Sequence, residues 1–363
     1  MNNTSLYSGE NGSLIKTPDV IPISLDYVGI VFVPLLFLLG LVGNLLTLRV
    51  MSSKVYRQLP VSKLLIALSL SDILVNLLLP FNMASLRELI GTDPRALSAG
   101  GCKLYFWAYR FSRLTASWMV VMICCERFVA VWAHIKARYI NTTRNAYLVI
   151  GIVYGGFAVY VGYTCSWSDR IIDGVCIINS RQPGLEKRTR LFLAIGLALY
   201  SLIPSLILIV LTSLLIFKLV RLGRKKSRRV GPPSAPGTTL GVPGSTERTT
   251  GGKSVRTSRT NMMLLSVVFA FIILITPNAI AHLISFVKKK NIFEANDPAS
   301  RFLRESSQLM EQLNHSINFV LYVISSKRFR DGIRAIFMPK KNINDLSSSV
   351  TMNNVSNVQG RQS

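Results

Sequence analysis

Charged residues are scarce in this sequence: Asp, Glu, Lys and Arg make up only 16% of its 363 residues, whereas hydrophobic residues make up 50%. The apolar residues come in long blocks that short basic connectors separate. The uncharged block at 28–48 is by itself long enough to cross the hydrocarbon layer of a bilayer, which is roughly 30 Å thick. The sequence therefore favours a membrane protein with several spans over a soluble protein of two domains.

Acidic residues are the scarcer kind, because 17 Asp and Glu face 42 Lys and Arg and leave a formal net charge of +25. Such an excess would suggest a nucleic-acid partner if it covered a folded surface. Most of it lies instead in a few connectors, where basic residues mark the cytoplasmic side of a membrane protein. We therefore expect the lipid bilayer, and no nucleic acid, as a partner.

Catalytic motifs are also missing, since the chain contains neither HExxH nor GxSxG. Residues 251–254 resemble the end of a phosphate-binding loop, but Glu247 stands where that motif needs its first glycine. We therefore expect no enzyme and no cofactor. Residues 1–26 lack the basic start and apolar core of a cleavable signal peptide, so the first apolar block is expected to act as a signal anchor.

Seven hydrophobic segments are present, and they predict an all-α membrane protein built as a seven-transmembrane helix bundle. The segments lie at about 27–50, 64–86, 102–131, 148–164, 191–219, 262–287 and 309–325. Lys and Arg concentrate in the connectors after the first, third, fifth and seventh segments. The positive-inside rule makes these connectors cytoplasmic and the N-terminus extracellular, as expected for a multi-pass protein of the plasma membrane.

The chain is expected to divide into four regions. Residues 1–26 form an extracellular tail in which Asn2, Asn3 and Asn11 begin glycosylation sequons. Residues 27–326 form the bundle, with a disordered third cytoplasmic loop at about 224–258 because this stretch is rich in Gly, Pro, Ser and Thr. Residues 327–338 alternate apolar and basic side chains as an amphipathic helix on the inner leaflet does, and 339–363 form a polar cytoplasmic tail.

The third segment carries arginines that a membrane helix cannot turn toward lipid. Cys102, Tyr109, Arg113 and Arg127 fall within roughly 20° of one line along the helix. An arginine at the bilayer centre costs about 2.5 to 3.5 kcal/mol, so this face must contact other helices or an internal cavity. Asp72 in the second segment likewise needs polar partners or a cation.

Several motifs occur in an order that is typical of one receptor family. They are Gly43-Asn44 in the first segment, Leu68-Ser69-Leu70-Ser71-Asp72 in the second, Glu126-Arg127-Phe128 ending the third, Pro204 in the fifth, Phe271 and Pro277 in the sixth, and Asn318-Phe319-Val320-Leu321-Tyr322 in the seventh. With this ordered set, the chain resembles class A (rhodopsin-like) G protein-coupled receptors over about 27–337. The resemblance implies an extracellular ligand, a heterotrimeric G protein activated by helix rearrangement, and arrestin and receptor kinases as further partners.

The resemblance also implies a pairing among the five cysteines. Cys102, Cys165 and Cys176 fall at or outside the outer ends of helices, where the compartment allows oxidation. Cys124 and Cys125 lie at the inner end and are expected to stay reduced. In similar receptors a cysteine at the position of Cys102 binds the second outer loop, so the expected disulfide joins Cys102 to Cys176 rather than to Cys165.

In similar receptors the aspartate at the position of Asp72 works with polar groups of the seventh segment around a sodium ion. Here those groups are Asn314 and Asn318, and Ala116 replaces a serine that commonly helps to bind the ion. Sodium is therefore the one metal that the resemblance implies, as an allosteric modulator at Asp72. The alternative is a structural aspartate with buried hydrogen bonds.

The resemblance also implies a switch at the inner end of the bundle. Glu126 is expected to hold Arg127 and to release it when the helices rearrange, and Tyr322 belongs to the same switch. Several departures bear on it, among them Thr212, which stands where a tyrosine often faces Arg127. Ile275 stands where many relatives carry a ligand-sensing tryptophan, and Phe319 replaces the proline of the seventh segment. Signalling through a tryptophan toggle is therefore not expected.

The ligand pocket is expected around an intramembrane ion pair between Arg113 and Glu311. The resemblance argues against an amine receptor, because Tyr109 replaces an aspartate, and against an opsin, because Gln312 replaces the retinal-binding lysine. The residues expected to line the pocket with this pair are Tyr109, Arg110, Asn82, Asn278, His282 and Gln308. The alternative for Arg110 is that its side chain snorkels outward.

Polar groups spread over four segments suit an extended ligand with many hydrogen-bonding groups, which points to a short peptide. The sequence at 313–322 also resembles invertebrate neuropeptide receptors of the FMRFamide type. The alternative ligand is a small acid, a lipid or a nucleotide attracted to Arg110 and Arg113. A transporter or channel is the more distant alternative, but neither half of the chain mirrors the other.

Overall fold

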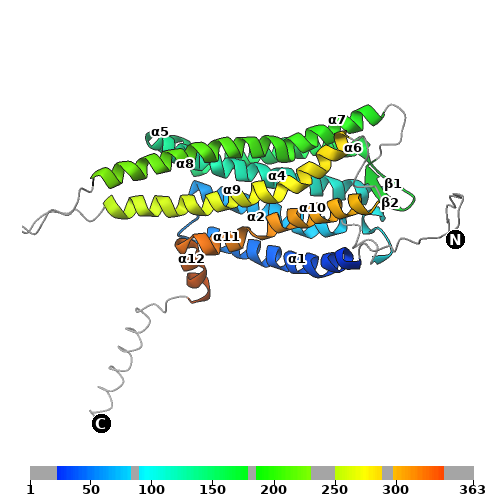
Figure 1. Cartoon of the computed structure of the whole chain (residues 1–363), viewed down its shortest axis with the longest axis horizontal. Coiled ribbons are helices and arrows are strands. Elements are labelled where there is room, and N and C mark those ends of the chain that lie inside the picture. Colours follow the sequence, from blue (N-terminus) through cyan, green and yellow to red (C-terminus); the bar gives the residue numbers. More distant parts are fainter. Residues whose placement is uncertain (1–22, 83–89, 179–184, 230–249, 288–296, 339–363) are drawn as a thin grey trace, which may run out of the picture.

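Long helices lie side by side in one bundle in the computed structural model (Figure 1). The structure describes residues 23–82, 90–178, 185–229, 250–287 and 297–338. Its elements are α1 (Ile23–Met51), α2 (Pro60–Leu78), η1 (Leu79–Asn82), η2 (Pro94–Ala96), α4 (Ala99–Trp132), α5 (His134–Ile140), α6 (Thr143–Ser168), β1 (Asp169–Ile172), β2 (Val175–Ile178), α7 (Leu185–Leu197), the π turn η3 (Ala198–Leu202), α8 (Ile203–Arg229), α9 (Thr250–Val287), α10 (Pro298–Ser316), α11 (Asn318–Ser325) and α12 (Lys327–Phe337). Within these ranges the only strands form one short hairpin, so the expected helical architecture is confirmed.

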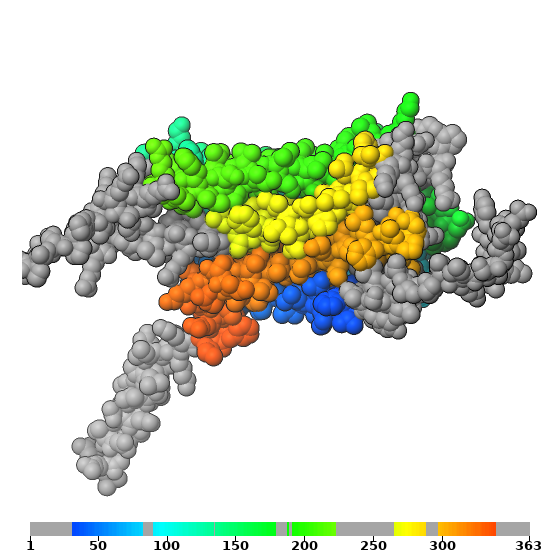
Figure 2. Space-filling view, viewed as in Figure 1, coloured from blue at the N-terminus to red at the C-terminus, as the bar shows by residue number. Residues whose placement is uncertain are grey.

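Six of the described helical stretches are long and apolar enough to cross a membrane. They are Val31–Met51, Pro60–Asn82, Ala99–Trp132, Thr143–Ser168, Leu191–Leu222 and Leu265–Val287. The seventh segment is divided into α10 and α11 and contains more polar residues. Some of these, such as Glu311 and Gln312, are completely buried. It packs between α1 and α9 on the face shown in Figure 2, which completes the seven predicted segments.

The outer surface of the bundle is apolar, whereas its interior is rich in polar side chains. Phe32 and Leu35 on α1 and Ile152 on α6 are about half exposed or more, although each is strongly hydrophobic. Asn44 and Asp72 are each 1% exposed. This distribution is the inverse of a soluble protein's and fits a surface that contacts lipid.

The two ends of the bundle carry different elements. β1 and β2 pair antiparallel, with Ile171 opposite Cys176, at the end where α1 begins (Figure 1). Asp173 and Gly174 form their two-residue turn with φ of 50° and 72°, the positive values that a tight Asp-Gly hairpin turn requires. α12 lies across the opposite end, where α8 ends and α9 begins (Figure 1).

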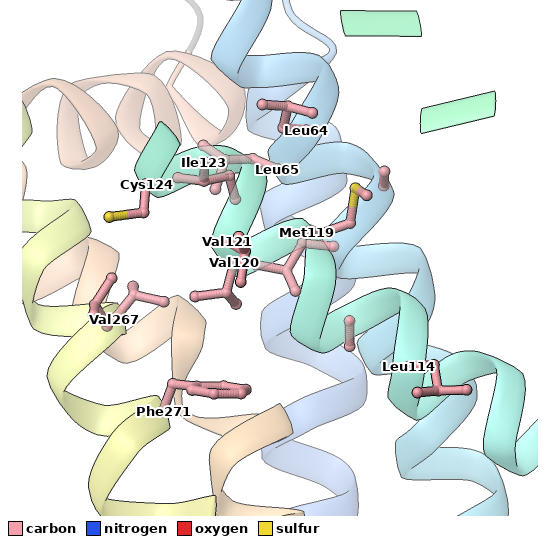
Figure 3. Close-up of a cluster of buried hydrophobic side chains, with 14 of the residues drawn as sticks. Leu64, Leu65, Leu114, Met119, Val120, Val121, Ile123, Cys124, Val267 and Phe271 are labelled. Atoms are coloured by element: carbon pink, nitrogen blue, oxygen red, sulfur yellow. The ribbon is translucent and has the colours of Figure 1, made fainter. Parts of the chain in front are cut away.

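Bulky apolar side chains fill the bundle between α2, α4 and α9 (Figure 3). Leu65, Val120, Val267 and Phe271 from these helices are each at most 5% exposed. Val120, Val267 and Phe271 also line the space beside Asp72. A rearrangement at Asp72 therefore bears directly on how α9 packs against α4.

One predicted boundary differs from the structure. The sequence predicts a disordered loop at about 224–258, but α8 continues to Arg229 and α9 already begins at Thr250. α8 extends into this stretch because its Lys and Arg residues favour helix, and the first prolines come only at 232–233. Residues 230–249 lie outside the described ranges, as do 1–22 with Asn2, Asn3 and Asn11, and 339–363. α12 coincides with the amphipathic helix predicted at 327–338.

Candidate functional site

An ion pair inside the bundle joins α4 to α10. Arg113 Nε contacts Glu311 Oε1, and the side chain of Glu311 is completely buried. The Tyr200 hydroxyl donates to the same carboxylate oxygen at 2.8 Å, and the Asn278 amide donates to the other at 2.5 Å. The structure thus contains the intramembrane pair that the sequence suggests. Two neutral donors supply further hydrogen bonds to its carboxylate.

Tyr200 reaches this pair because the fifth segment contains the π turn η3. Pro204 has no backbone N–H and cannot donate to the carbonyl of Tyr200. The N–H of Ile203 bonds one residue further back than in an α-helix, and Trp118 Nε1 donates to the Leu199 carbonyl at 2.9 Å. Single π turns of this kind recur at functional sites. Sequence reasoning missed Tyr200; the signal was a tyrosine in an apolar segment, one turn before a proline.

Aromatic rings flank the guanidinium of Arg113. Its Cζ lies 4.0 Å from the ring centre of Tyr200 and 5.0 Å from that of Tyr109. Such contacts stabilise a desolvated cation through the negative face of the ring. The Asn82 side chain interacts with that of Tyr109, and Asn82 Oδ1 accepts from Arg95 at 3.0 Å. Tyr109 and Asn82 therefore belong to the group around Arg113.

Two further predicted pocket residues lie on the neighbouring helices. Gln308 is 3% exposed and lies one turn before Glu311 on α10, and His282 is half-buried and lies one turn after Asn278 on α9. Within the described ranges, the buried atoms Arg113 Nη2, Asn278 Oδ1 and Gln308 Oε1 have no hydrogen-bond partner. Buried polar atoms without partners are uncommon, so this group is suited to receive a polar ligand.

Arg110 has an ion-pair partner of its own. Its two terminal nitrogens each lie 2.7 Å from an oxygen of Asp169, which is completely buried at the start of β1. The rings of Phe106 and Phe192 flank its guanidinium at 4.7 and 5.0 Å. Outward snorkelling of Arg110 is therefore wrong, because the hairpin supplies an internal carboxylate. That Arg110 lines the ligand pocket stays a prediction.

The hairpin is fixed to α4 by a disulfide between Cys102 and Cys176, whose Cα atoms are 5.7 Å apart. This confirms the implied pairing, and Cys165 is a buried free thiol. Asp93 Oδ2 accepts from the N–H of Cys176 at 3.0 Å and from Arg95 at 2.7 Å. Burial by itself would raise the pKa of Asp93, but the hydrogen bonds from Arg95 and Cys176 outweigh it and hold this pKa below its usual value.

Asp72 accepts two hydrogen bonds from the seventh segment. His315 Nδ1 lies 2.7 Å from one carboxylate oxygen and Asn318 Nδ2 lies 2.7 Å from the other. The contact with Asn318 is the predicted one, but His315 takes the role assigned to Asn314, which only lines the same space. Because protein donors engage both oxygens and Ala116 adds none, these residues do not fit the predicted sodium ion.

The seventh segment breaks between α10 and α11 although no proline lies there. The carbonyl of His315 accepts from Asn44 on α1 at 3.0 Å and from Asn76 on α2 at 3.2 Å. These amides satisfy a carbonyl that the helix end leaves free, which is the local condition that a proline would otherwise create. Phe319, just after the break, fits against Gly43, where an added Cβ would lie 2.7 Å from Phe319 Cβ.

The contact predicted between Glu126 and Arg127, near the C-terminal end of α4, is also present. Glu126 Oε2 lies 2.7 Å from Arg127 Nε. The Asn141 amide, which follows α5, donates to the Glu126 carbonyl at 3.0 Å. Tyr322 on α11 is 1% exposed and packs against Phe329 of α12, with ring centres 5.4 Å apart. The end of the bundle that carries α12 thus holds an arginine through a neighbouring carboxylate.

Comparison with known proteins agrees with this arrangement. Growth hormone secretagogue receptor type 1 of Sus scrofa is 25% identical over 313 residues, which are 81% of this chain and 76% of that protein. Neuromedin-U receptor 1 and neuromedin-U receptor 2 of Homo sapiens are each 30% identical, over 142 and 131 residues; these are 39% and 35% of this chain and 32% and 30% of those proteins. Residues 43–323 match the 7 transmembrane receptor (rhodopsin family) model, so the chain belongs to the rhodopsin family of seven-transmembrane receptors.

Proposed function

We propose that this receptor binds an extracellular peptide around Arg113 and Glu311 and activates a heterotrimeric G protein inside the cell. The charge of the connectors supports the orientation: the basic stretches adjoin the bundle end with α12, so the N-terminus and the β-hairpin face outward. The ligand then enters from the hairpin end. The G protein approaches the end at which Arg127 is held.

The observation that carries the proposal is that both arginines suspected of attracting an acidic ligand are already neutralised. Arg113 contacts Glu311, and Arg110 contacts Asp169, with both carboxylates completely buried. An acidic ligand at either arginine would place a second negative charge beside the existing carboxylate in a poorly solvated site. The charge pattern therefore disfavours the small acid, the acidic lipid and the nucleotide.

The unpaired atoms of the pocket favour a peptide instead. Arg113 Nη2 is a donor, and Asn278 Oδ1 and Gln308 Oε1 are acceptors. The peptide backbone presents C=O and N–H groups in alternation and can satisfy both kinds of atom without added charge. The similar proteins are named as receptors for neuromedin U and for growth hormone secretagogues, which supports a signalling peptide by analogy.

Ligand contact at Glu311 can reach two other helices directly. Tyr200 couples the carboxylate to η3 before α8, and Asn278 couples it to α9. Ile275 is completely buried where a tryptophan could otherwise sense the ligand, so we assign that sensing to this polar network. A shift of these helices relative to α4 releases Arg127 from Glu126, because two packed arrangements of the inner end can interconvert.

Receptor kinases and arrestin complete the proposal. Ser347, Ser348, Ser349 and Thr351 are the candidate phosphorylation sites, and they lie outside the described residues. Phosphates on such a tail would add the negative charge that a basic partner surface recognises.

The test is a screen of amidated short peptides on cells that express the chain, with guanine-nucleotide exchange in their membranes as the readout. At least one peptide should raise exchange above that in cells without the receptor. Glu311→Gln, at matched surface density, should shift the dose response to higher concentration. A receptor that responded to organic acids or nucleotides, but to no peptide, would overturn the ligand class.

A further inference from the structure

The environment of Asp72 differs from one built around a hard cation. Its carboxylate is 1% exposed, and each oxygen already accepts a hydrogen bond at 2.7 Å, from His315 on α10 and from Asn318 on α11. The imidazole is as buried as the carboxylate, and its Nδ1 contacts the carboxylate directly. The negative charge of the Asp72 carboxylate is therefore compensated by nitrogen donors of the same chain.

The surrounding side chains offer little to a sodium ion. Hard cations prefer several oxygen ligands, whereas imidazole nitrogen suits transition metals. The space beside Asp72 is lined otherwise by apolar residues such as Leu68, Ala116 and Val120. Asn314 and Asn318 are the other residues there whose oxygen atoms could bind an ion. The Asn318 side chain already directs its nitrogen to Asp72.

The imidazole is also fixed in place through its backbone. Two amides, from Asn44 on α1 and Asn76 on α2, hold the His315 carbonyl, and the adjacent Ser316 hydroxyl donates to Asn76 Oδ1 at 2.8 Å. These contacts immobilise the end of α10 that carries the ring. Because the backbone of His315 is held, its ring stays beside Asp72 unless the hydrogen bond between them breaks.

We infer that His315 takes the place of a bound cation, so that the folded receptor gains no stability from sodium. The ring holds α2 to the seventh segment directly, through His315 Nδ1 and Asp72. A bound ion stabilises only the state that binds it, so a protein without the site unfolds at the same temperature whichever monovalent cation is present. This inference does not depend on the identity of the ligand.

The test uses the purified full-length receptor in lipid nanodiscs, with thermal unfolding measured in NaCl and in N-methylglucamine chloride at equal ionic strength. The wild type should unfold at the same temperature in both salts. His315→Asn keeps an N–H donor near the position of Nδ1 and should behave in the same way. His315→Ser removes the ring and adds a hydroxyl oxygen, so sodium should raise its unfolding midpoint by about 2 °C or more.

Two controls separate the outcomes. Adding Asp72→Asn to His315→Ser should abolish the gained response, because the carboxylate is the charge that the ion would neutralise. A wild type stabilised by sodium would overturn the inference. So would a His315→Ser receptor that folds and ignores sodium, since His315 would then not be what excludes the ion. If that variant fails to fold, the wild type and His315→Asn still decide the matter, because sodium stabilisation of either contradicts it.

Discussion

The carboxylate of Glu311 on α10 contacts the guanidinium of Arg113 on α4, and the side chains of Tyr200 and Asn278 donate to the same carboxylate. One buried charge pair thereby brings together the third, fifth, sixth and seventh segments. A pair in this position cannot lose one member cheaply, because the remaining charge would be left in a poorly solvated interior.

Glu311→Gln should destabilise the receptor by about 3 to 5 kcal/mol, because it leaves Arg113 buried without a counter-charge. The measurement is the thermal unfolding midpoint of the purified protein together with its density at the cell surface. Asp331→Asn, the same change at an exposed position of α12, should leave both unchanged. The double exchange Arg113→Glu with Glu311→Arg should recover part of the stability that either single charge reversal loses. A double exchange that recovers nothing would contradict the pair.

Gly43→Ala should destabilise the receptor by about 1 to 3 kcal/mol, because the new methyl group would lie 2.7 Å from Phe319 Cβ and would overpack the contact. Phe319→Ala in the same chain should restore much of the lost stability by making room. The matched control is Gly151→Ala on α6, where nothing lies within 4 Å of the added atom. Equal unfolding midpoints for the two glycine variants would refute the close approach of α1 and α11.

The spans and the main ion pair could be predicted because their causes are local or forced. Hydrophobic blocks longer than the bilayer thickness must form helices, whatever the rest of the chain does. Arg113 and Glu311 are costly in a membrane unless paired, and each lies at a similar depth in its segment. Sequence alone therefore narrows their partners to a few residues.

The partners of Asp72 and Arg110 could not be predicted in the same way. Asn314 and His315 are neighbours about 100° apart on a helix, so a rotation of α10 decides which of them faces Asp72. That rotation depends on the break at the end of α10, which Asn44 and Asn76 hold from other helices. Tertiary packing, rather than any pattern in the seventh segment, makes the choice.

The partner of Arg110 could not be predicted for a related reason. This partner, Asp169, lies at the start of the β-hairpin, and only the fold of β1 against β2 brings that carboxylate to α4. The shift of Tyr200 toward Glu311 likewise needs the π turn, whose presence Pro204 favours without requiring. Loop folds and single-residue shifts are the parts of this site that a linear pattern does not encode.

Cys176→Ser should lower the stability by about 4 kcal/mol in the chain-entropy account, because the disulfide closes a loop with a sequence separation of 74 residues. Thermal unfolding of the purified receptor measures the loss, and a reducing agent should produce a similar loss in the wild type. Cys125→Ser, which alters a half-buried free thiol, serves as the control. A reduced wild type with an unchanged midpoint would show that the bridge does not restrain the loop.

Asp93→Asn should lower the unfolding midpoint at neutral pH, because the hydrogen bonds to Arg95 and to the N–H of Cys176 favour the charged carboxylate. Since the pKa of Asp93 is depressed in the folded state, its contribution is present in full above its unfolded pKa of about 3.9. The contribution is lost as the pH falls through the folded pKa.

The gap between wild type and Asp93→Asn should therefore be the same at pH 7 and pH 5 and should narrow below about pH 4. Unfolding scans of both proteins across this range provide the measurement. A gap that closed already between pH 7 and pH 5 would assign the effect to another group.

Guanine-nucleotide exchange by the purified receptor in nanodiscs tests the proposed function most directly, with a panel of heterotrimeric G proteins and the most active peptide from the screen. The peptide should accelerate exchange on at least one G protein with the wild type, and a higher peptide concentration should be needed with Glu311→Gln. The contradictory result is a peptide-independent exchange rate on every G protein, together with ion flux through the receptor in liposomes that contain no G protein.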